Sequence, residues 1–351
     1  MASVTLGKSS VRSDIIVVAM RVPFGIFDHV DRGEGPLAAL YESRLRLVEA
    51  ADAAGFRTYH VAEHHATSLG MAPSPGIFLA ALAKRTRRIR FGPLVYILPL
   101  YPPLRLIEEI CMLDQLSGGR FELGVGRGIS PYELAYNNVD FLEAAEIYEE
   151  ALQVIVAGLT QKTLTYRGRH YQFRGVPMEL EPVQRPHPPL WQGVTSAESA
   201  TAAAKRGASV VGHGPIAGLR PIVEAYLAAW DGQASGAGLV GCGRHIHVAE
   251  TDAEAMKIAA PAYRAWYDSL VSLWRKFRSV PFHFAETLEI AIAKDSAIVG
   301  SPATVRAEIE RHLSESRCNY FVTRFAYGTL THEQSARSLA LFASEVMPHF
   351  A

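Results

Sequence analysis

"RIRFGPLVYILPLYPPLRLIEEICMLDQLSGGRFELGVGRG", residues 88–128, predicts a strand, a helix and a second strand in immediate succession. The apolar run at 89–98 is typical of a buried strand, and a helix is expected at 104–116. The turn "SGGR" at 117–120 then leads into a strand at 121–126. Strands that alternate with helices in this way belong to a parallel sheet covered by helices.

The same strand and helix unit extends over most of the chain. A helix at 37–54, with Gly55 as its stop, precedes a strand at 58–62, and a helix at 75–83 follows. The other expected strands lie at 14–20, 189–194, 208–212, 245–249 and 319–325, and further helices begin near Ser196, Leu219, Asp252, Pro302 and His332. Thr251 with Glu254, and Thr331 with Gln334, have the spacing of a capping box. About eight strands favour a closed (β/α)8 barrel, a TIM barrel.

An open dinucleotide-binding sheet is disfavoured. Its glycine fingerprint should follow the first strand, whereas "GVGRGI" follows about the fourth and has Ile129 in place of the third glycine. We therefore expect one α/β domain over 1–351 with two insertions. Residues 161–188 contain a hairpin and a Pro-rich return, and the irregular segment 275–300 is expected to form a lid.

Composition excludes several classes of partner. The 351 residues include 35 basic and 35 acidic side chains, so no broad positive field attracts nucleic acid or an anionic membrane. The chain shows no apolar signal core and no membrane-spanning run. Its three cysteines, Cys111, Cys242 and Cys318, suggest neither a disulfide framework nor a thiolate zinc site. We expect a cytoplasmic protein with a small-molecule partner.

Two adjacent histidines follow the strand in "HVAEHHATSLG", residues 60–70. Strand side chains alternate, so His64 should point with His60 and the other histidine, His65, with Glu63. In a barrel the residues after the strands form the active face, so one histidine should face it. The alternative is a hydrogen-bonded loop residue.

A metal site is a second alternative. His245 and His247 would share one face of a strand, but no strand-end aspartate or lysine completes a ligand set. No metal is therefore expected. Neither a G-x-S-x-G elbow nor a cysteine–histidine–asparagine arrangement supports nucleophilic catalysis.

An anion site is better supported. Arg127 and Gly128 follow one strand, and Thr195, Ser196 and Ser199 surround the start of a helix after another. Free backbone amides, the helix dipole and an arginine suit a phosphate. The alternative is that Thr195 and Glu198 only cap the helix and that the glycines at 124, 126 and 128 only form a bend.

The order of these motifs resembles the bacterial luciferase-like flavin monooxygenases over nearly the whole chain. The segment through "LDQLSGGRFELGVGRG" is the most specific, and "AAGFRTYHVAEHH", "EPVQRPHPPLW", "AWYDSL", "VGSPATVRAEIE" and "SEVMPHF" occur in the same order. The resemblance implies a luciferase-like TIM barrel with an insertion that holds reduced FMN at the C-terminal face of its strands.

The resemblance also implies roles for particular residues. His64 matches the catalytic histidine of the family, and Arg127, Thr195, Ser196 and Ser199 match its phosphate-binding positions. Leu94 and Val95 match the place where the family often has a non-proline cis peptide beneath the flavin ring. The chain departs from luciferase in having Gly126 for a cysteine, Pro102 for a histidine and Ala145 for a second phosphate-binding arginine, which argues against light emission.

By resemblance, the chain is expected to be a two-component monooxygenase. A separate NAD(P)H:flavin reductase would supply reduced FMN as a co-substrate, and O₂ would provide the oxygen inserted into a small, apolar organic substrate. The alternatives are a deazaflavin-dependent oxidoreductase of the same fold and a non-catalytic flavin-binding protein. Relatives suggest a homodimer, but the residues of this sequence do not show an interface.

Overall fold

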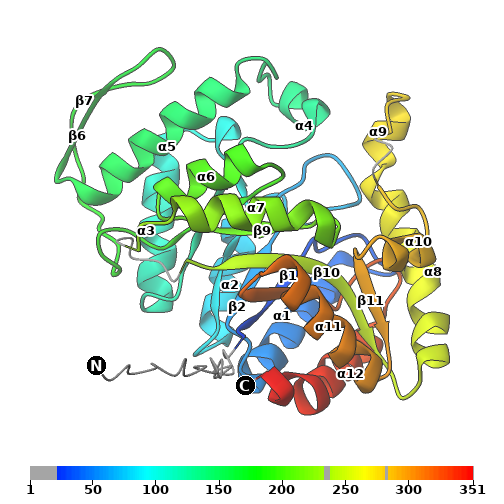
Figure 1. Ribbon diagram of the computed structural model, residues 1–351. Helices are drawn as coiled ribbons and strands as arrows, with labels where there is room; N and C mark the ends of the chain where they lie inside the picture. The colour runs from blue at the N-terminus through cyan, green and yellow to red at the C-terminus, as the bar shows by residue number, and fades with distance from the viewer. Residues whose placement is uncertain (1–21, 233–237, 281–283, 351) are drawn as a thin grey trace, which may run out of the picture.

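Eight parallel strands form a closed ring at the centre of the computed structural model (Figure 1), which describes residues 22–232, 238–280 and 284–350. Neighbouring strands pair in register from β3 through β2, β1, β12, β10, β9 and β8 to β5. An isolated bridge between Phe91 and Phe121 joins β3 to β5 and closes the ring. The strands are β1 (Phe24–Asp28), β2 (Thr58–Val61), β3 (Arg90–Pro93), β5 (Leu123–Gly126), β8 (Leu190–Gly193), β9 (Ser209–Gly212), β10 (Val240–Val248) and β12 (Tyr320–Arg324). The expected (β/α)8 barrel is confirmed.

Helices surround this ring, and several begin where the sequence signals indicated. Thr331 and Gln334 form a complete capping box, and the Thr251 hydroxyl accepts a hydrogen bond from the Glu254 amide. Gly55 ends the first helix with a left-handed φ of 87°. The main helices are α1 (Leu37–Ala54), α2 (Pro75–Arg85), α3 (Pro103–Ser117), α5 (Ala144–Thr160), α6 (Ala197–Lys205), α7 (Ile216–Ala229), α8 (Asp252–Leu270), α11 (Pro302–Ser316) and α12 (His332–Leu341). None of the helices within the described ranges has the length and apolarity needed to cross a membrane.

Large side chains fill the barrel interior. His60, Trp191 and Tyr320 are fully buried there, with the His60 and Trp191 ring centroids 4.8 Å apart. Gly25 faces them, because a Cβ at this position would overlap the Tyr320 hydroxyl. The interior is therefore a packed core, as expected for a barrel of eight strands.

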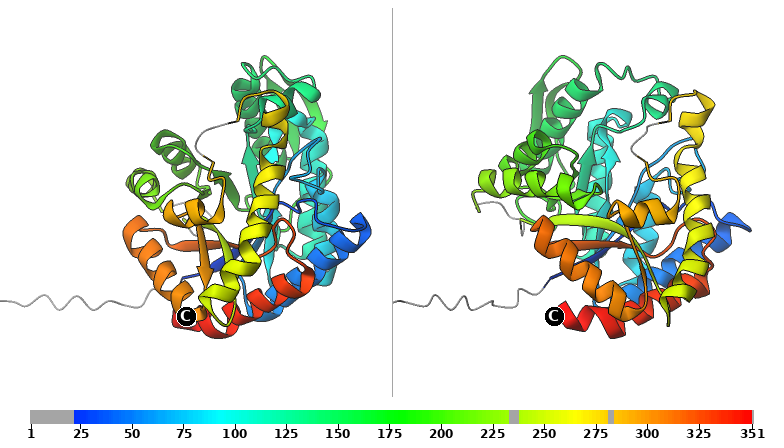
Figure 2. Two further views of the ribbon diagram at one scale, coloured as in Figure 1. Left: turned by 90° about the vertical axis from the view of Figure 1, so that its right-hand side faces the viewer. Right: turned by 45° about the vertical axis from the view of Figure 1, so that its right-hand side comes forward.

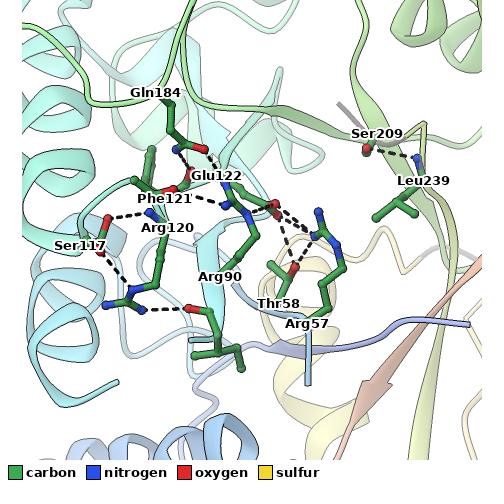
Figure 3. Close-up of polar contacts among 12 residues, drawn as sticks. Arg57, Thr58, Arg90, Ser117, Arg120, Phe121, Glu122, Gln184, Ser209 and Leu239 are labelled. Carbon is green, nitrogen blue, oxygen red and sulfur yellow. Dashed lines mark hydrogen bonds and ion pairs between the residues drawn. The ribbon is translucent and has the colours of Figure 1, made fainter. Parts of the chain in front are cut away.

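A polar network closes the barrel at the N-terminal ends of its strands (Figure 3). Glu122 is fully buried, and its carboxylate forms ion pairs with Arg90 Nε at 2.6 Å and with Arg57 Nη1 at 3.1 Å. Gln184 accepts from Arg90 at 2.6 Å and donates to the Phe121 carbonyl at 2.6 Å, which ties the Pro-rich segment to this end. These contacts serve stability, and they leave the opposite end of the barrel for function.

One expected strand lies outside the described residues, the expected hairpin is present, and another expected strand is divided. The strand expected at 14–20 lies outside the described residues, and the first described strand is β1 at Phe24–Asp28. The hairpin is confirmed as the antiparallel pair β6 (Thr163–Arg167) and β7 (Gln172–Pro177). The strand expected at 89–98 is divided into β3, β4 (Tyr96–Ile97) and the short helix η1 (Leu98–Leu100).

The prediction that 275–300 is irregular throughout was wrong for its second half. This half contains α10 (Leu288–Ala293) and β11 (Ala297–Gly300), and β11 pairs in parallel with the end of β10. Both elements are too short for periodicity to show. The first half carries the end of α9 (Ser272–Lys276).

Candidate active site at the barrel mouth

The candidate site lies at the C-terminal ends of the barrel strands and in the loops that follow them, which we call the mouth. His64 follows β2, is half-buried, and has its Nδ1 atom 3.1 Å from Oε1 of Glu133. Glu133 is buried in α4 (Pro131–Tyr136), the helix that follows β5 and Arg127. The contact thus connects the loops after two different strands.

The second histidine points elsewhere, as strand alternation predicted. His65 Nε2 lies 2.8 Å from Glu63 Oε1, and the other carboxylate oxygen of Glu63 accepts from the Ile97 amide at 3.0 Å. Burial raises the pKa of Glu63, and the hydrogen bond that His65 donates to Glu63 raises the pKa of His65. This pair holds the loop after β3 in place and leaves His64 as the histidine of the mouth.

The peptide between Leu94 and Val95 is cis, as the resemblance implied. It lies between β3 and β4, where β5 approaches closely. A Cβ on Gly124 would overlap the Pro93 carbonyl oxygen, and a Cβ on Gly126 would lie 2.5 Å from Val95 Cγ2. Glycine at 124 and 126 is therefore a packing requirement of this edge of the mouth.

The predicted anion-binding residues follow two neighbouring strands, β5 and β8. Arg127 is exposed, with its guanidinium 5.3 Å from the centre of the Phe141 ring. Ser196 caps α6, and its hydroxyl and that of Ser199 each accept a hydrogen bond from the other's backbone amide. The alternative cap by Thr195 and Glu198 was wrong, because the helix begins one residue later, at Ala197.

These donors fit a phosphate group. Thr195 and Ser196 are exposed at the start of α6, where the helix dipole and the first-turn amides that the capping box does not use favour an anion. Gly193, at the end of β8, has open space where a Cβ would stand. The predicted residues therefore follow β2, β3, β5 and β8, four strands that succeed one another around the ring.

Sequence reasoning missed the residues on the other half of the mouth. His29 follows β1, its ring centroid lies 5.4 Å from that of His64, and its Nδ1 accepts from Trp266 Nε1 at 3.2 Å. His213 follows β9 and lies 5.2 Å from the Phe27 ring. Burial lowers the pKa of His29 well below its usual value. Each histidine comes directly after a strand, so the predicted strand at 208–212 already pointed to His213, whereas His29 could be found only once β1 was recognised.

The paired histidines of β10 have a different environment from a metal site. His245 is buried, and its Nε2 lies 2.8 Å from Nη1 of Arg324 on β12. A guanidinium that donates to this nitrogen occupies its lone pair and repels a metal cation. His247 is buried near the end of β10, where burial lowers its pKa to about 4.

Aromatic contacts link the two helices that rise beside the mouth, α4 and α9 (Figure 2). The Tyr132 ring stacks on Phe277 with centroids 4.0 Å apart, and Trp274 packs edge-on against Tyr132 at 5.5 Å. The Tyr132 hydroxyl also hydrogen-bonds to Ser279. The loop after β5 and the segment after α8 are therefore joined on the side where a lid was expected.

A comparison with family models matches the "Luciferase-like monooxygenase" family over residues 22–318. The chain belongs to this family. The predicted fold class, family and enzyme class, a flavin-dependent monooxygenase, are thereby confirmed.

Individual proteins are similar to this luciferase-like monooxygenase in sequence or in fold. Protein y4wF of Sinorhizobium fredii is 40% identical over 336 residues, covering 94% of this chain and 98% of the relative. The oxygenase component of a flavin-dependent trigonelline monooxygenase from Acinetobacter baylyi is 29% identical over 191 residues, 53% of each chain. The crystal structure of monooxygenase RslO1 from Streptomyces bottropensis has 27% identity and a TM-score of 0.84, covering 94% of this chain and all of that one.

Proposed function

We propose that this luciferase-like monooxygenase is the oxygenase of a two-component system. It uses reduced FMN, delivered by a separate NAD(P)H:flavin reductase, and O₂ to oxygenate a small organic substrate with an apolar body. The main support is that His64, the cis peptide and the anion-binding residues follow four consecutive strands of one barrel mouth. The relative from Acinetobacter baylyi is likewise an oxygenase component.

Under this proposal, the phosphate of FMN is held where β5 and β8 end. Arg127 supplies a charge and a planar donor group, and the amides of α6 with Thr195, Ser196 and Ser199 supply hydrogen bonds. The Leu94–Val95 peptide supports the flavin ring. Reduced FMN, when bound, supplies the electrons that activate O₂.

His64 is proposed to transfer a proton beside the flavin. Glu133 engages Nδ1 at 3.1 Å and so fixes the ring orientation, which leaves Nε2 for a reacting molecule. Glu133 is therefore a positioning residue.

Water must be kept from the activated oxygen, since its decay competes with substrate oxidation. The Tyr132–Phe277 stack joins two segments beside the mouth, so we assign the lid to α4, α9 and residues 277–280. Opening of this stack would admit substrate.

The test uses FMN that has been chemically reduced without oxygen, so that no reductase is needed. The protein and a panel of aldehydes, ketones and thioethers are then mixed with ¹⁸O₂. One ¹⁸O atom in the product, with oxygen uptake that depends on that substrate, is the expected result. Substrate reduction without oxygen uptake, driven by a reduced deazaflavin, would contradict the proposal, and so would flavin binding with no turnover of any panel member.

A further inference from the structure

His29 is a second histidine of the mouth, and its ring lies beside that of His64. Gly25, Phe27 and His29 occupy alternate positions of the extended chain, which place the first two in the barrel interior and His29 just beyond the end of β1. The ring centroids of His29 and His64 are 5.4 Å apart, with 37° between the ring planes. The two imidazoles therefore border the same small region, where β1 and β2 end.

Trp266 fixes the position of the proton on the His29 ring. The indole Nε1 of Trp266, on α8, lies 3.2 Å from Nδ1 of His29, and an indole N–H can only donate a hydrogen bond. Nδ1 is therefore the acceptor and carries no proton, which places the single proton of the neutral ring on Nε2. Burial first, and the positive charge of Arg324 second, lower the pKa of His29, so the ring stays neutral at neutral pH.

The Nε2–H group of His29 is left for a ligand. No group within the described residues bonds to Nε2, and this atom is not one of the unpaired polar atoms that lack accessible surface. The His29 residue is 6% exposed and the His64 side chain 14% exposed. In His64 as well, Nδ1 is engaged, by Glu133 at 3.1 Å, which leaves Nε2. Each of the two neighbouring rings thus keeps one nitrogen for a reacting molecule.

The backbone directly after His29 has an unusual conformation. Val30 is fully buried with a φ of 51°, in the left-handed region that β-branched residues rarely adopt. Its amide donates to Asp28 Oδ1 at 2.7 Å, and its carbonyl accepts from the Met71 amide at 2.9 Å. Strained backbone persists only where its surroundings enforce it, and it is concentrated at functional sites. Here it fixes the chain that carries the His29 ring.

A purely structural role for His29 ends at Trp266. The ring satisfies the buried indole N–H, which would otherwise lack an acceptor. That role requires only an acceptor at the position of Nδ1, which the amide oxygen of an asparagine also supplies. It does not account for a second polar nitrogen with accessible surface beside His64.

We propose that His29 is a further residue of the reaction site, which donates a hydrogen bond from Nε2 to an oxygen atom of the substrate while His64 transfers a proton. The inference rests on the function proposed above. Because its Nδ1 is engaged, His29 supplies a donor and does not take up a proton from the substrate. A donor that is held in place before the reaction stabilises negative charge that develops on such an oxygen. The substrate therefore carries a carbonyl or hydroxyl oxygen at or beside the reacting atom.

Two substitutions separate the donor from the contact with Trp266. His29→Asn keeps an acceptor near the position of Nδ1 and removes the donor, whereas His29→Gln places an amide donor near the position of Nε2. With reduced FMN and ¹⁸O₂, His29→Asn should lower kcat for aldehydes and ketones by about tenfold or more, the effect of a lost donor to a developing charge. Thioether turnover should change by less than about threefold, because a thioether sulfur is a weak acceptor. His29→Gln should retain more aldehyde and ketone turnover than His29→Asn.

His312→Asn is the matched control. It makes the same substitution at a buried histidine of α11, and it keeps an acceptor for Arg244. Its kcat should stay within about twofold of the wild-type value, as for a substitution that keeps its hydrogen bond.

NMR of the flavin-free protein with ¹⁵N-labelled histidine tests the tautomer without turnover. The His29 signals, assigned by their loss in His29→Gln, should show the proton on Nε2 from about pH 6 to about pH 8, with no titration near the ordinary pKa of about 6.5. Trp266→Phe removes the indole donor and should let the proton occupy either nitrogen. If His29→Asn does not fold, this measurement on the wild type decides.

The outcomes distinguish this inference from the proposed function. A proton on Nδ1 of His29, wild-type ketone turnover in His29→Asn, or equal losses for ketones and thioethers would overturn the inference alone. Turnover of thioethers without any turnover of aldehydes or ketones would do the same. No ¹⁸O in the product of any panel member, with the wild-type protein, would remove the proposed function and the inference with it.

Discussion

His64 and Glu133 are 69 positions apart in the sequence, and their side chains meet at 3.1 Å across the barrel mouth. Ser130 holds the first turn of α4 through the Glu133 amide, so the carboxylate is presented by a capped helix and not by a free loop. This contact links the proposed proton-transfer residue to the loop that also carries Arg127.

Substitutions at this contact should lower turnover without weakening flavin binding. His64→Ala is expected to reduce kcat by about 100-fold or more, the usual contribution of a general acid or base. Glu133→Gln keeps an acceptor for Nδ1 and should cost less than Glu133→Ala. Oxygen uptake gives kcat, and flavin fluorescence gives affinity. A Glu133→Ala enzyme with wild-type kcat would show that the contact is only structural.

Arg127 should recognise the phosphate and not the flavin ring. Arg127→Met is expected to weaken FMN binding by about tenfold or more, corresponding to a lost charge-assisted hydrogen bond of about 1.5–3 kcal/mol. Riboflavin, which lacks the phosphate, should bind the variant and the wild type equally. Arg167→Met, at an exposed arginine of the hairpin, is the control and should change neither affinity. Equal losses for FMN and riboflavin would place Arg127 elsewhere in the site.

Two glycines of neighbouring strands, Gly124 of β5 and Gly193 of β8, give a matched pair for stability. A Cβ at Gly124 would overlap the Pro93 carbonyl, whereas a Cβ at Gly193 would meet nothing within 4 Å. Gly124→Ala should therefore lower the free energy of unfolding by about 1–3 kcal/mol or more, because backbone must move. Gly193→Ala should change it by less than about 0.5 kcal/mol. Urea unfolding measures both, and similar values for the two variants would contradict the close approach of β5 to β3.

The ion-pair network at the closed end should affect folding alone. Glu122→Gln leaves Arg57 and Arg90 without their buried carboxylate, and removing one partner of a buried pair costs about 3–5 kcal/mol. The folded Glu122→Gln protein should bind FMN with the same affinity as the wild type. If the variant bound FMN more weakly while its free energy of unfolding was unchanged, the closed end of the barrel would have a role in FMN binding.

Stability should fall in mild acid. Burial lowers the pKa of His60 and His247 to about 4 and that of His312 to about 3, whereas an unfolded histidine titrates near about 6.5. The unfolded chain thus binds more protons below pH 6.5, and each imidazole lowers the free energy of unfolding by up to about 1.4 kcal/mol per pH unit as the pH falls toward 4. Asp31, whose pKa burial raises to about 6, acts in the opposite direction.

Urea unfolding between pH 7 and pH 4.5 measures this dependence. His312→Asn, which keeps an acceptor for Arg244, should reduce the slope of unfolding free energy against pH by about one proton. A wild-type slope near zero would contradict the neutral, buried state of these histidines.

Much of the fold could be predicted from local sequence. Alternating apolar runs and helix caps located most strands and helices, and the period of two in "HVAEHH" correctly separated His64 from His65. These features depend on neighbouring residues along the chain, which sequence shows directly. Short elements such as β11 were missed because four residues carry too little periodicity.

Only the tertiary structure decided which of these residues meet. Arg324 lies in a strand that the sequence predicted, but its contact with His245 depends on β12 and β10 being neighbours in the ring. Glu133 reaches His64, and His29 reaches Trp266, only because the ring closes and brings strand ends together. Local sequence determined the helices and strands and the directions in which their side chains point. Contacts and charge compensation between residues far apart in the sequence are properties of the closed barrel.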